Sequence, residues 1–349
     1  MKIGLFDHIE HGGRPLAQLF DERLAFIQAA GDEAGLYCLH LAEHHQTPLN
    51  MVPIPGVFLG AVARATTRIK MGPLVYLLPL VSPLRLIDEI CMLDHLSNGR
   101  MEVGVGRGVS PFELKYHKVE HDQSREIFID AYECIRAGLT TDELTYHGPH
   151  YSYDKVPIAL RPLQQPHPPF WYGSSGPEGS TWAGEHGMHF VTLGPNEFAK
   201  TNIDTFKQAF ARRGGKAAQP KSEFSGGIAM GVQRHIFVDE NDEKAARWAK
   251  PAMEVHLKHI NWLRSKHGMT QTQVRMRNVR GTTFEECVAE GTVIAGSPKT
   301  VLAEIEKQMA QIGANYLLTY MFLGNMSLDN AMRSLELFRA EVMPKLERL

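Results

Sequence analysis

The chain has 349 residues, 43% of them hydrophobic and 22% charged, with a formal net charge of −2, which is ordinary for a globular enzyme and allows a sizeable core. This balance gives no sign of a broad basic surface for nucleic acid or a membrane, and no apolar run approaches the ~20 residues that span a bilayer. The four cysteines lack the short spacing of a zinc or redox motif and the amino terminus lacks a signal-peptide layout, so we expect a cytoplasmic protein with reduced cysteines.

Short apolar runs alternate with longer segments of helical periodicity along most of the chain. We expect eight strands, at 2–8, 37–43, 68–78, 100–106, 169–174, 188–193, 226–239 and 315–322. Each is followed by a helix, at 15–35, 55–67, 83–97, 122–138, 178–186, 196–213, 241–266 and 327–347 respectively. A further helix is expected at 297–312. Two long stretches without clear periodicity, 140–168 and 267–292, interrupt the alternation.

Alternation of strands and helices predicts a parallel sheet, and eight such units in a chain of this length favour a closed (β/α)8 TIM barrel of the α/β class. The rival fold is an open doubly wound sheet. It should carry a glycine-rich turn after its first strand, and the sequence HIEHGGRP at that place does not match. We therefore expect one barrel domain over residues 1–349, with insertions near 140–168 and 267–292.

Three consecutive ionisable residues, Glu43, His44 and His45, follow the second predicted strand. Barrel enzymes place their chemistry at the carboxyl ends of the strands, so this run is expected at the barrel mouth. A histidine there can exchange protons near neutral pH, and a neighbouring carboxylate can hold its ring. One alternative is a structural histidine in a loop. Another is a metal site shared with His8 and His11, but no later strand end offers an obvious Asp or His to complete it, and we expect no metal.

Two segments rich in glycine and serine follow the fourth and fifth predicted strands. In GVGRG at 104–108 the glycines permit a flat ligand to approach the backbone, and Arg107 can meet an anion. In GSSGPEGS at 173–180, the amides of a helix start and the hydroxyls of Ser174, Ser175 and Ser180 suit a phosphate. The structural alternatives are packing glycines in a narrow barrel and an ordinary serine-capped turn. Together the two segments predict one phosphorylated ligand at the rim.

The order and spacing of several motifs resemble the bacterial luciferase-like flavin monooxygenases over nearly the whole chain. The motifs are AEHH at 42–45, SPLRLIDEICMLDHLSNGRMEVGVGRG at 82–108, SRE at 124–126, WYGSSGPEGSTWAGEHG at 171–187, AGSPKTV at 295–301 and LFRAEVMPKL at 337–346. The resemblance implies a barrel that binds reduced FMN from a separate flavin reductase, lets it react with molecular oxygen to a peroxyflavin, and oxygenates a small organic substrate. It also implies a homodimer, and we expect the apolar helices after the second and third strands at its interface.

Carried over position by position, the resemblance assigns roles to residues of the expected mouth. His44 looks like the family's catalytic histidine, with His45 and Glu43 in support, and Glu113 falls where luciferase has an acidic residue near the flavin. The residues expected to bind the cofactor are Leu74 and Val75 at a cis peptide beneath the flavin ring, Arg107 and Arg125 at the phosphate, Val109, and the loop residues Ser174, Ser175, Gly176 and Ser180.

The stretch 267–292 resembles the family's mobile lid, in which Arg275, Arg277 and Arg280 are expected to close over the site. Gly106 stands where luciferase has a reactive cysteine, and glycines replace hydroxyl residues in the phosphate loop, so light emission and long-chain aldehyde substrates are not expected. Two alternatives stay open. One is a deazaflavin-dependent hydride-transfer enzyme on the same scaffold, and the other is a non-catalytic flavin-binding subunit.

Overall fold

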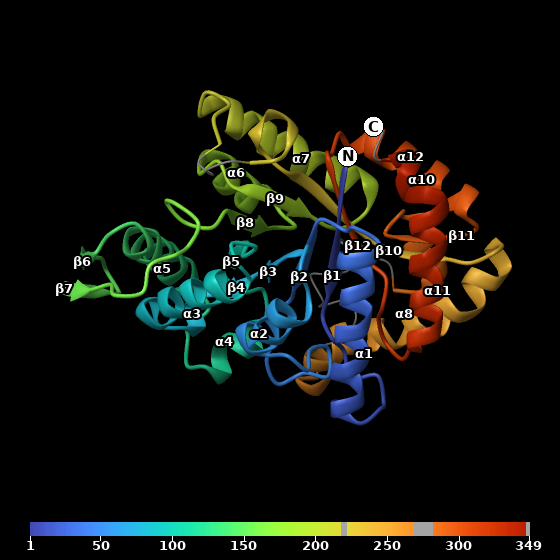
Figure 1. Ribbon diagram of the computed structural model, residues 1–349, viewed down its shortest axis with the longest axis horizontal. Coiled ribbons are helices and arrows are strands. Elements are labelled where there is room, and N and C mark those ends of the chain that lie inside the picture. The colour runs from blue at the N-terminus through green and yellow to red at the C-terminus, as the bar shows by residue number, and fades with distance from the viewer. Residues whose placement is uncertain (218–221, 269–281, 347–349) are drawn as a thin grey trace.

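The computed structural model describes residues 1–217, 222–268 and 282–346, and at its centre the strands form a nearly closed parallel barrel (Figure 1). The strands are β1 (Lys2–Asp7), β2 (Cys38–Leu41), β3 (Lys70–Pro73), β4 (Tyr76–Leu77), β5 (Val103–Gly106), β8 (Phe170–Gly173), β9 (His189–Thr192), β10 (Met230–Val238), β11 (Val293–Gly296) and β12 (Tyr316–Tyr320). They are hydrogen-bonded in the order β3-β2-β1-β12-β10-β9-β8-β5-β4, and β11 pairs with β10. A parallel bridge between Met71 and Met101 brings β3 against the start of β5. The TIM barrel predicted from the sequence is therefore confirmed.

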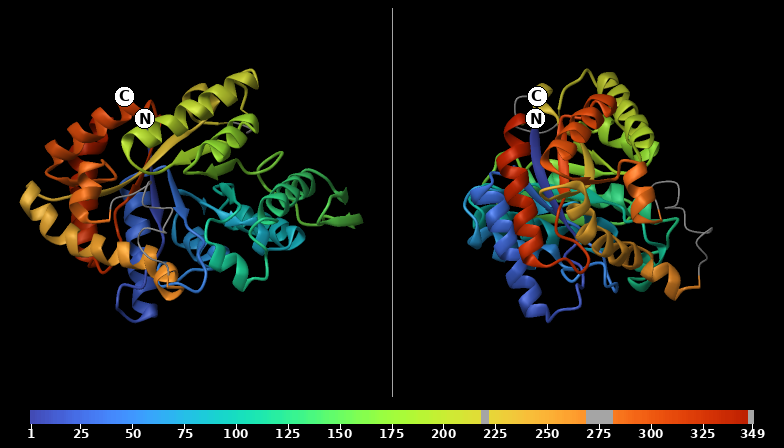
Figure 2. Two further views of the ribbon diagram at one scale, coloured as in Figure 1. Left: turned by 180° about the vertical axis from the view of Figure 1, so that it is seen from behind. Right: turned by 90° about the vertical axis from the view of Figure 1, so that its right-hand side faces the viewer.

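Helices surround the barrel and connect its strands (Figures 1 and 2). They are α1 (Leu16–Gln28), α2 (Pro55–Ala65), α3 (Pro83–Leu96), α4 (Pro111–Tyr116), α5 (Ser124–Leu139), α6 (Pro177–Glu185), α7 (Asn196–Arg212), α8 (Asp242–Lys266), α9 (Phe284–Ala289), α10 (Pro298–Ile312), α11 (Leu328–Leu337) and α12 (Met343–Leu346). Short π-helical segments, Ala29–Glu33 and Phe338–Val342, extend α1 and α11. Among the described residues, no helix is both long and apolar enough to cross a membrane.

Local sequence explains where these elements form. β1, β5 and β10 consist almost wholly of buried residues, because a barrel strand is covered by side chains inside and by helices outside. α10 begins with a strong signal, since the side chain of Ser297 accepts the N–H of Thr300 and Pro298 occupies the first turn. It ends at Gly313, whose φ of 72° favours glycine. Such signals place most predicted boundaries close to the observed ones.

The structure corrects the sequence prediction for residues 140–168, which were expected to be irregular. They contain an antiparallel hairpin formed by β6 (Glu143–His147) and β7 (Ser152–Pro157). Most residues of this hairpin are exposed or half-buried, so its sequence lacks the apolar runs by which the barrel strands were predicted. The insertion is thus an ordered hairpin at one side of the barrel, beyond α5 (Figure 1).

Two further differences concern the strand count. The strand predicted at 68–78 is divided into β3 and β4 by a cis peptide between Leu74 and Val75. The described part of 267–292 contains α9, and β11 follows it, so the main sheet has ten strands where eight were expected. β11 was missed because only four residues separate the aperiodic stretch that ends at 292 from the helix predicted at 297.

Candidate active site

Glu43, His44 and His45 follow β2 and therefore lie at the carboxyl-terminal mouth of the barrel. Glu113, from the short helix α4 after β5, reaches this run. Its Oε1 lies 3.2 Å from Nδ1 of His44, and its Oε2 accepts the backbone N–H of His45 at 3.0 Å. The carboxylate of Glu113 thus holds both the ring of His44 and the backbone beside it.

The pKa of His44 is raised above its usual value. Burial of the ring is the largest single effect and opposes its charge, but the charge of Glu113, the hydrogen bond to Glu113 and the charge of Glu43 together outweigh it. Burial also opposes the charge on Glu113, yet His44 and the N–H of His45 lower the pKa of this carboxyl. The two groups are therefore held as an ion pair, and His44 keeps its proton to higher pH than a free histidine does.

Glu43 and His45 form a second pair, which supports the loop that carries His44. Nε2 of His45 lies 2.9 Å from Oε1 of Glu43. Oε2 of Glu43 accepts the backbone N–H of Leu77 at 3.1 Å and so connects this loop to β4. Because His45 is buried and Glu43 is already bound on both oxygens, these two side chains fix the position of His44.

The peptide between Leu74 and Val75 is cis, as the resemblance implies, and both side chains are half-buried. Two glycines of β5 pack directly against this segment. A Cβ at Gly104 would collide with the carbonyl oxygen of Pro73, and a Cβ at Gly106 would collide with the side chain of Val75. These contacts favour the packing interpretation of the glycines over the close approach of a flat ligand.

Two of the predicted phosphate-binding residues, Arg107 and Arg125, act on the region where β8 leads into α6. Arg125 forms an ion pair with Glu178 in the first turn of α6, at 2.9 Å. Burial raises the pKa of Tyr172, at the end of β8, and the charges of Arg125 and Arg107 both act against this rise, so both guanidinium groups are within electrostatic reach of this residue. Within the described ranges, no carboxylate forms an ion pair with Arg107. The place where β5, β8 and α6 meet therefore has an uncompensated cation.

The loop before α6 contains most of the remaining predicted residues. The N–H of Gly176 donates to Oγ of Ser174 at 3.2 Å, and Ser175 is half-buried. Ser180 is buried, and its hydroxyl donates to the carbonyl oxygen of Gly176 at 2.8 Å. This hydrogen bond stabilises the loop from its interior side. Val109 is exposed in the segment between β5 and α4. Ser174, Ser175 and Gly176 are thus partly exposed at the loop, whereas the side chain of Ser180 faces the protein interior.

A second acid–base cluster lies beside His44 and was missed in the sequence prediction. Glu10, buried just after β1, lies 2.7 Å from Nδ1 of His256 and 2.7 Å from Nδ1 of His259, both in α8. The ring of His8 lies between this cluster and His44, with ring centroids 5.4 Å from His44 and 5.8 Å from His256. The only available signal was the H-x-x-H spacing at 256–259, which puts both rings on one helix face.

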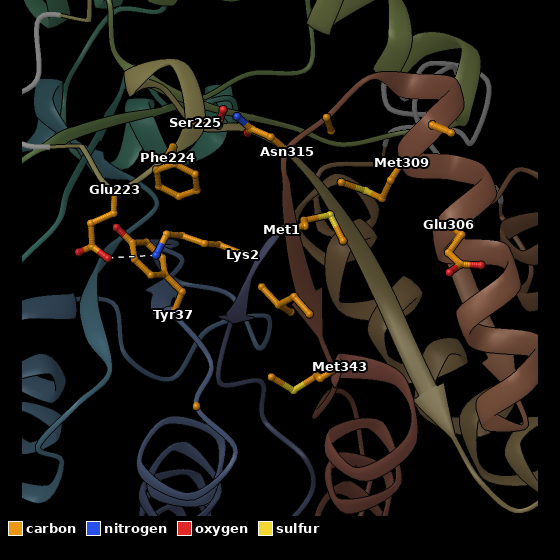
Figure 3. A pocket seen from close by; sticks show the side chains of 14 residues that line it. Met1, Lys2, Tyr37, Glu223, Phe224, Ser225, Glu306, Met309, Asn315 and Met343 are labelled. Carbon is orange, nitrogen blue, oxygen red and sulfur yellow. Dashed lines mark hydrogen bonds and ion pairs between the residues drawn. The ribbon is translucent and has the colours of Figure 1, made fainter. Parts of the chain in front are cut away.

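A pocket of 730 Å³ lies at the opposite end of the barrel (Figure 3). Met1 and Lys2 at the start of β1 and Asn315 before β12 line it, so it opens at the amino ends of the strands. Lys2 forms an ion pair with Glu223 at 3.0 Å, and methionine side chains supply much of the remaining wall. This face of a barrel usually serves stability, so we place the active site at the mouth that carries His44.

Two further predictions from the sequence are the arginines of a lid and the alternative of a metal site. Arg275, Arg277 and Arg280 lie outside the described residues. In the parts of the chain that the structure describes, no group of three or more His, Cys, Asp or Glu is placed to hold a metal ion.

Comparison with known proteins gives a consistent family relationship. The family model for luciferase-like monooxygenases matches residues 1–316. The uncharacterized protein y4wF of Sinorhizobium fredii is 33% identical over 345 residues, which cover 99% of this chain and 97% of that protein. The oxygenase component of the flavin-dependent trigonelline monooxygenase of Acinetobacter baylyi is 25% identical over 279 residues, covering 78% of this chain and 74% of that protein.

Solved structures share the fold over nearly the whole chain. The monooxygenase RslO1 from Streptomyces bottropensis has a TM-score of 0.85 at 23% identity and covers 99% of each chain. The oxygenating constituent of 3,6-diketocamphane monooxygenase from Pseudomonas putida, in complex with FMN, has a TM-score of 0.78 at 20% identity, covering 99% and 98%. The coenzyme F420-dependent tetrahydromethanopterin reductase from Methanopyrus kandleri has a TM-score of 0.73 at 17% identity, covering 99% and 100%.

Proposed function

The chain belongs to the luciferase-like monooxygenase family, and from this premise we propose that it is an FMN-dependent monooxygenase that transfers oxygen from O2 to a small organic substrate. The observation that carries the proposal is that one barrel mouth holds two complementary sites. One is the cationic site beside α6, which suits a flavin phosphate. The other is the His44–Glu113 ion pair, which suits control of a proton at the reacting end.

The donors beside α6 fit the phosphate of FMN. Arg107 lacks a carboxylate partner among the described residues, Arg125 is partly compensated by its ion pair, and α6 has no side-chain cap on its first amides. A phosphate dianion would neutralise the free guanidinium and accept the amide N–H groups. The half-buried side chains of Leu74 and Val75, next to the exposed Gly173, offer an apolar surface to a flat ring.

Reduced FMN, when bound, supplies the electrons with which molecular oxygen is activated. The residues of the chain bind, orient and control protons. Because Nδ1 of His44 is held by Glu113, Nε2 is the ring nitrogen that can give or take a proton at the mouth. We assign to Glu43 and His45 the supporting role that their contacts indicate, and to Arg107, Arg125 and the loop before α6 the binding of the phosphate.

Reduced flavin must reach this site from elsewhere. The similarity to a protein described as an oxygenase component supports a separate flavin reductase as a transient partner. A deazaflavin-dependent hydride transfer is the second candidate, and the similarity in fold to an F420-dependent reductase is what favours it. A non-catalytic flavin-binding subunit would have no use for the His44–Glu113 pair, so we rank it last.

We also propose that two copies associate through α2 and α3. Ile54 and Val57 at the start of α2, and Met92 and Leu96 in α3, are large apolar side chains that are exposed in the single chain. The two helices contact each other, so these side chains belong to adjoining surfaces. An exposed apolar surface of this kind is typical of an interface between subunits.

The cofactor proposal is tested by anaerobic titration of the purified chain with reduced FMN and, separately, with reduced coenzyme F420. We expect tighter binding of reduced FMN, and we expect His44→Ala to bind it as the wild type does, since this residue does not contact the phosphate site. Tighter binding of the deazaflavin would overturn the FMN assignment and support hydride transfer.

A further inference from the structure

The end of α8 packs against α4, the helix that carries Glu113. The ring of His267 stacks on Phe112 with centroids 4.1 Å apart, and its Nε2 lies 2.6 Å from Oη of Tyr116. Arg264, one turn before His267, is therefore close to the His44–Glu113 pair. Burial and the positive charge of Arg264 both act to lower the pKa of His44, against the combined effect of the neighbouring carboxylates. Burial likewise lowers the pKa of Arg264, and the charge of Glu113 acts against this. The half-buried guanidinium of Arg264 is therefore within electrostatic reach of both partners of the proposed proton-handling pair.

The carboxylates of this mouth are already paired with histidines. The pairs are Glu113 with His44 at 3.2 Å, Glu43 with His45 at 2.9 Å, and Glu10 with His256 at 2.7 Å and His259 at 2.7 Å. Each carboxylate therefore has a cationic or hydrogen-bonding partner of its own. None of them needs Arg264 to compensate its charge.

Arg264 itself lacks such a partner. Its Nη1 donates to the carbonyl oxygen of Ile260, one turn earlier in α8, at 3.1 Å. Among the described residues no carboxylate forms an ion pair with it. A guanidinium has five N–H donors, and a partly buried one without a carboxylate in direct contact is unfavourable, so the position calls for an anion.

The position of Arg264 is fixed by the fold. Glu10 binds Nδ1 of His256 and Nδ1 of His259, which fastens α8 against the segment after β1. Arg264 lies two helical turns beyond His256 on the same continuous helix. The helix therefore holds the guanidinium at the mouth, whereas Arg247, in the second turn of α8, is exposed and forms an ion pair with Glu243 at 3.2 Å.

We propose that Arg264 binds a carboxylate of the substrate beside His44, so that the substrate is a small organic acid. This inference rests on the proposed function, whose substrate class it names. Arg107 and Arg125 form a separate cationic site beside α6 for the flavin phosphate, so the phosphate leaves Arg264 uncompensated. A guanidinium receives a carboxylate through two parallel N–H donors, which would orient the acid with its remaining atoms toward the reacting end.

The test compares matched acids and amides as probes: benzoate with benzamide, phenylacetate with phenylacetamide, and cyclohexanecarboxylate with its amide. Binding to the full chain is measured by calorimetry, with and without oxidised FMN. In at least one pair the acid should bind more tightly than the amide. Arg264→Met should weaken that acid by about 10- to 100-fold, the range typical of a charged hydrogen bond, and leave the amide unchanged. Arg264→Lys should recover part of the loss, and the matched control Arg247→Met, an exposed arginine in the second turn of the same helix, should bind as the wild type does.

Three results would overturn the inference: no preference for acids in any pair, an unchanged preference in Arg264→Met, or a loss of FMN affinity in Arg264→Met in place of acid affinity. The last result would assign the arginine to the flavin. A parallel FMN titration of the wild-type chain reports the proposed function separately, so a failure of cofactor binding is distinguishable from a failure of acid binding. Circular dichroism confirms that each variant is folded.

Discussion

Replacement of Arg107 by methionine tests the phosphate site most sharply. The substitution removes the charge and keeps a long apolar side chain. Arg107 has no ion pair among the described residues, so its full charge is available to a ligand, and a hydrogen bond to a charged group contributes about 1.5–3 kcal/mol. The dissociation constant of FMN should therefore rise by about 10- to 150-fold. Arg125 is more than one-third exposed and already paired with Glu178, so Arg125→Met should cost about 1 kcal/mol or less, a factor of about five.

The assay is an equilibrium titration followed by flavin fluorescence, carried out with FMN and with riboflavin. Riboflavin lacks the phosphate, so both variants should bind it as the wild type does. Equal losses for FMN and riboflavin would show that the substitution disturbs the ring site or the fold. A larger loss in Arg125→Met than in Arg107→Met would refute the reasoning from charge compensation.

Three other substitutions probe the pair at the mouth, the proposed interface and the packing of the barrel. Glu113→Gln removes the largest effect that raises the pKa of His44, so this pKa, followed by NMR, should fall, and any limb of the activity profile due to His44 should move to lower pH; an unchanged titration contradicts the pairing. Val57→Glu alters an exposed side chain, so the fold should persist while light scattering shows a single copy; a mass still equal to two copies would refute the α2 interface. Gly104→Ala should lower the free energy of unfolding by about 1–3 kcal/mol in urea, because a Cβ there would collide with the carbonyl oxygen of Pro73; an unchanged free energy of unfolding would contradict the packing account.

The barrel could be predicted because its information is local. Most barrel strands are runs of buried residues, and the long helices have an amphipathic pattern, so periodicity separates them. The hairpin of β6 and β7 escaped because its residues are mostly exposed and alternate weakly. β11 was missed because it directly follows the aperiodic stretch 267–292 and directly precedes the helix predicted at 297. Both failures concern segments whose structure depends on pairing partners more than on their own sequence.

The candidate site was predictable only in part for the same reason. The position of His44 follows from the end of β2, and the resemblance pointed to Glu113, but their contact spans 69 positions in the sequence. The contact between Glu10 and His256 spans 246 positions and has no local pattern beyond the spacing of two histidines. No sequence motif marks Arg264. Its proposed role depends on the carboxylates of the mouth being paired with histidines, which only the structure shows.

The central claim is that this mouth supports the reaction of reduced FMN with molecular oxygen. Rapid mixing of the chain loaded with reduced FMN against oxygenated buffer tests it most directly, with absorbance recorded through the whole reaction. The account predicts a transient absorbance that belongs to neither reduced nor oxidised flavin, and a shorter lifetime of this species in His44→Ala. Direct conversion of reduced to oxidised flavin at the rate of free FMN, identical in the two proteins, would contradict it.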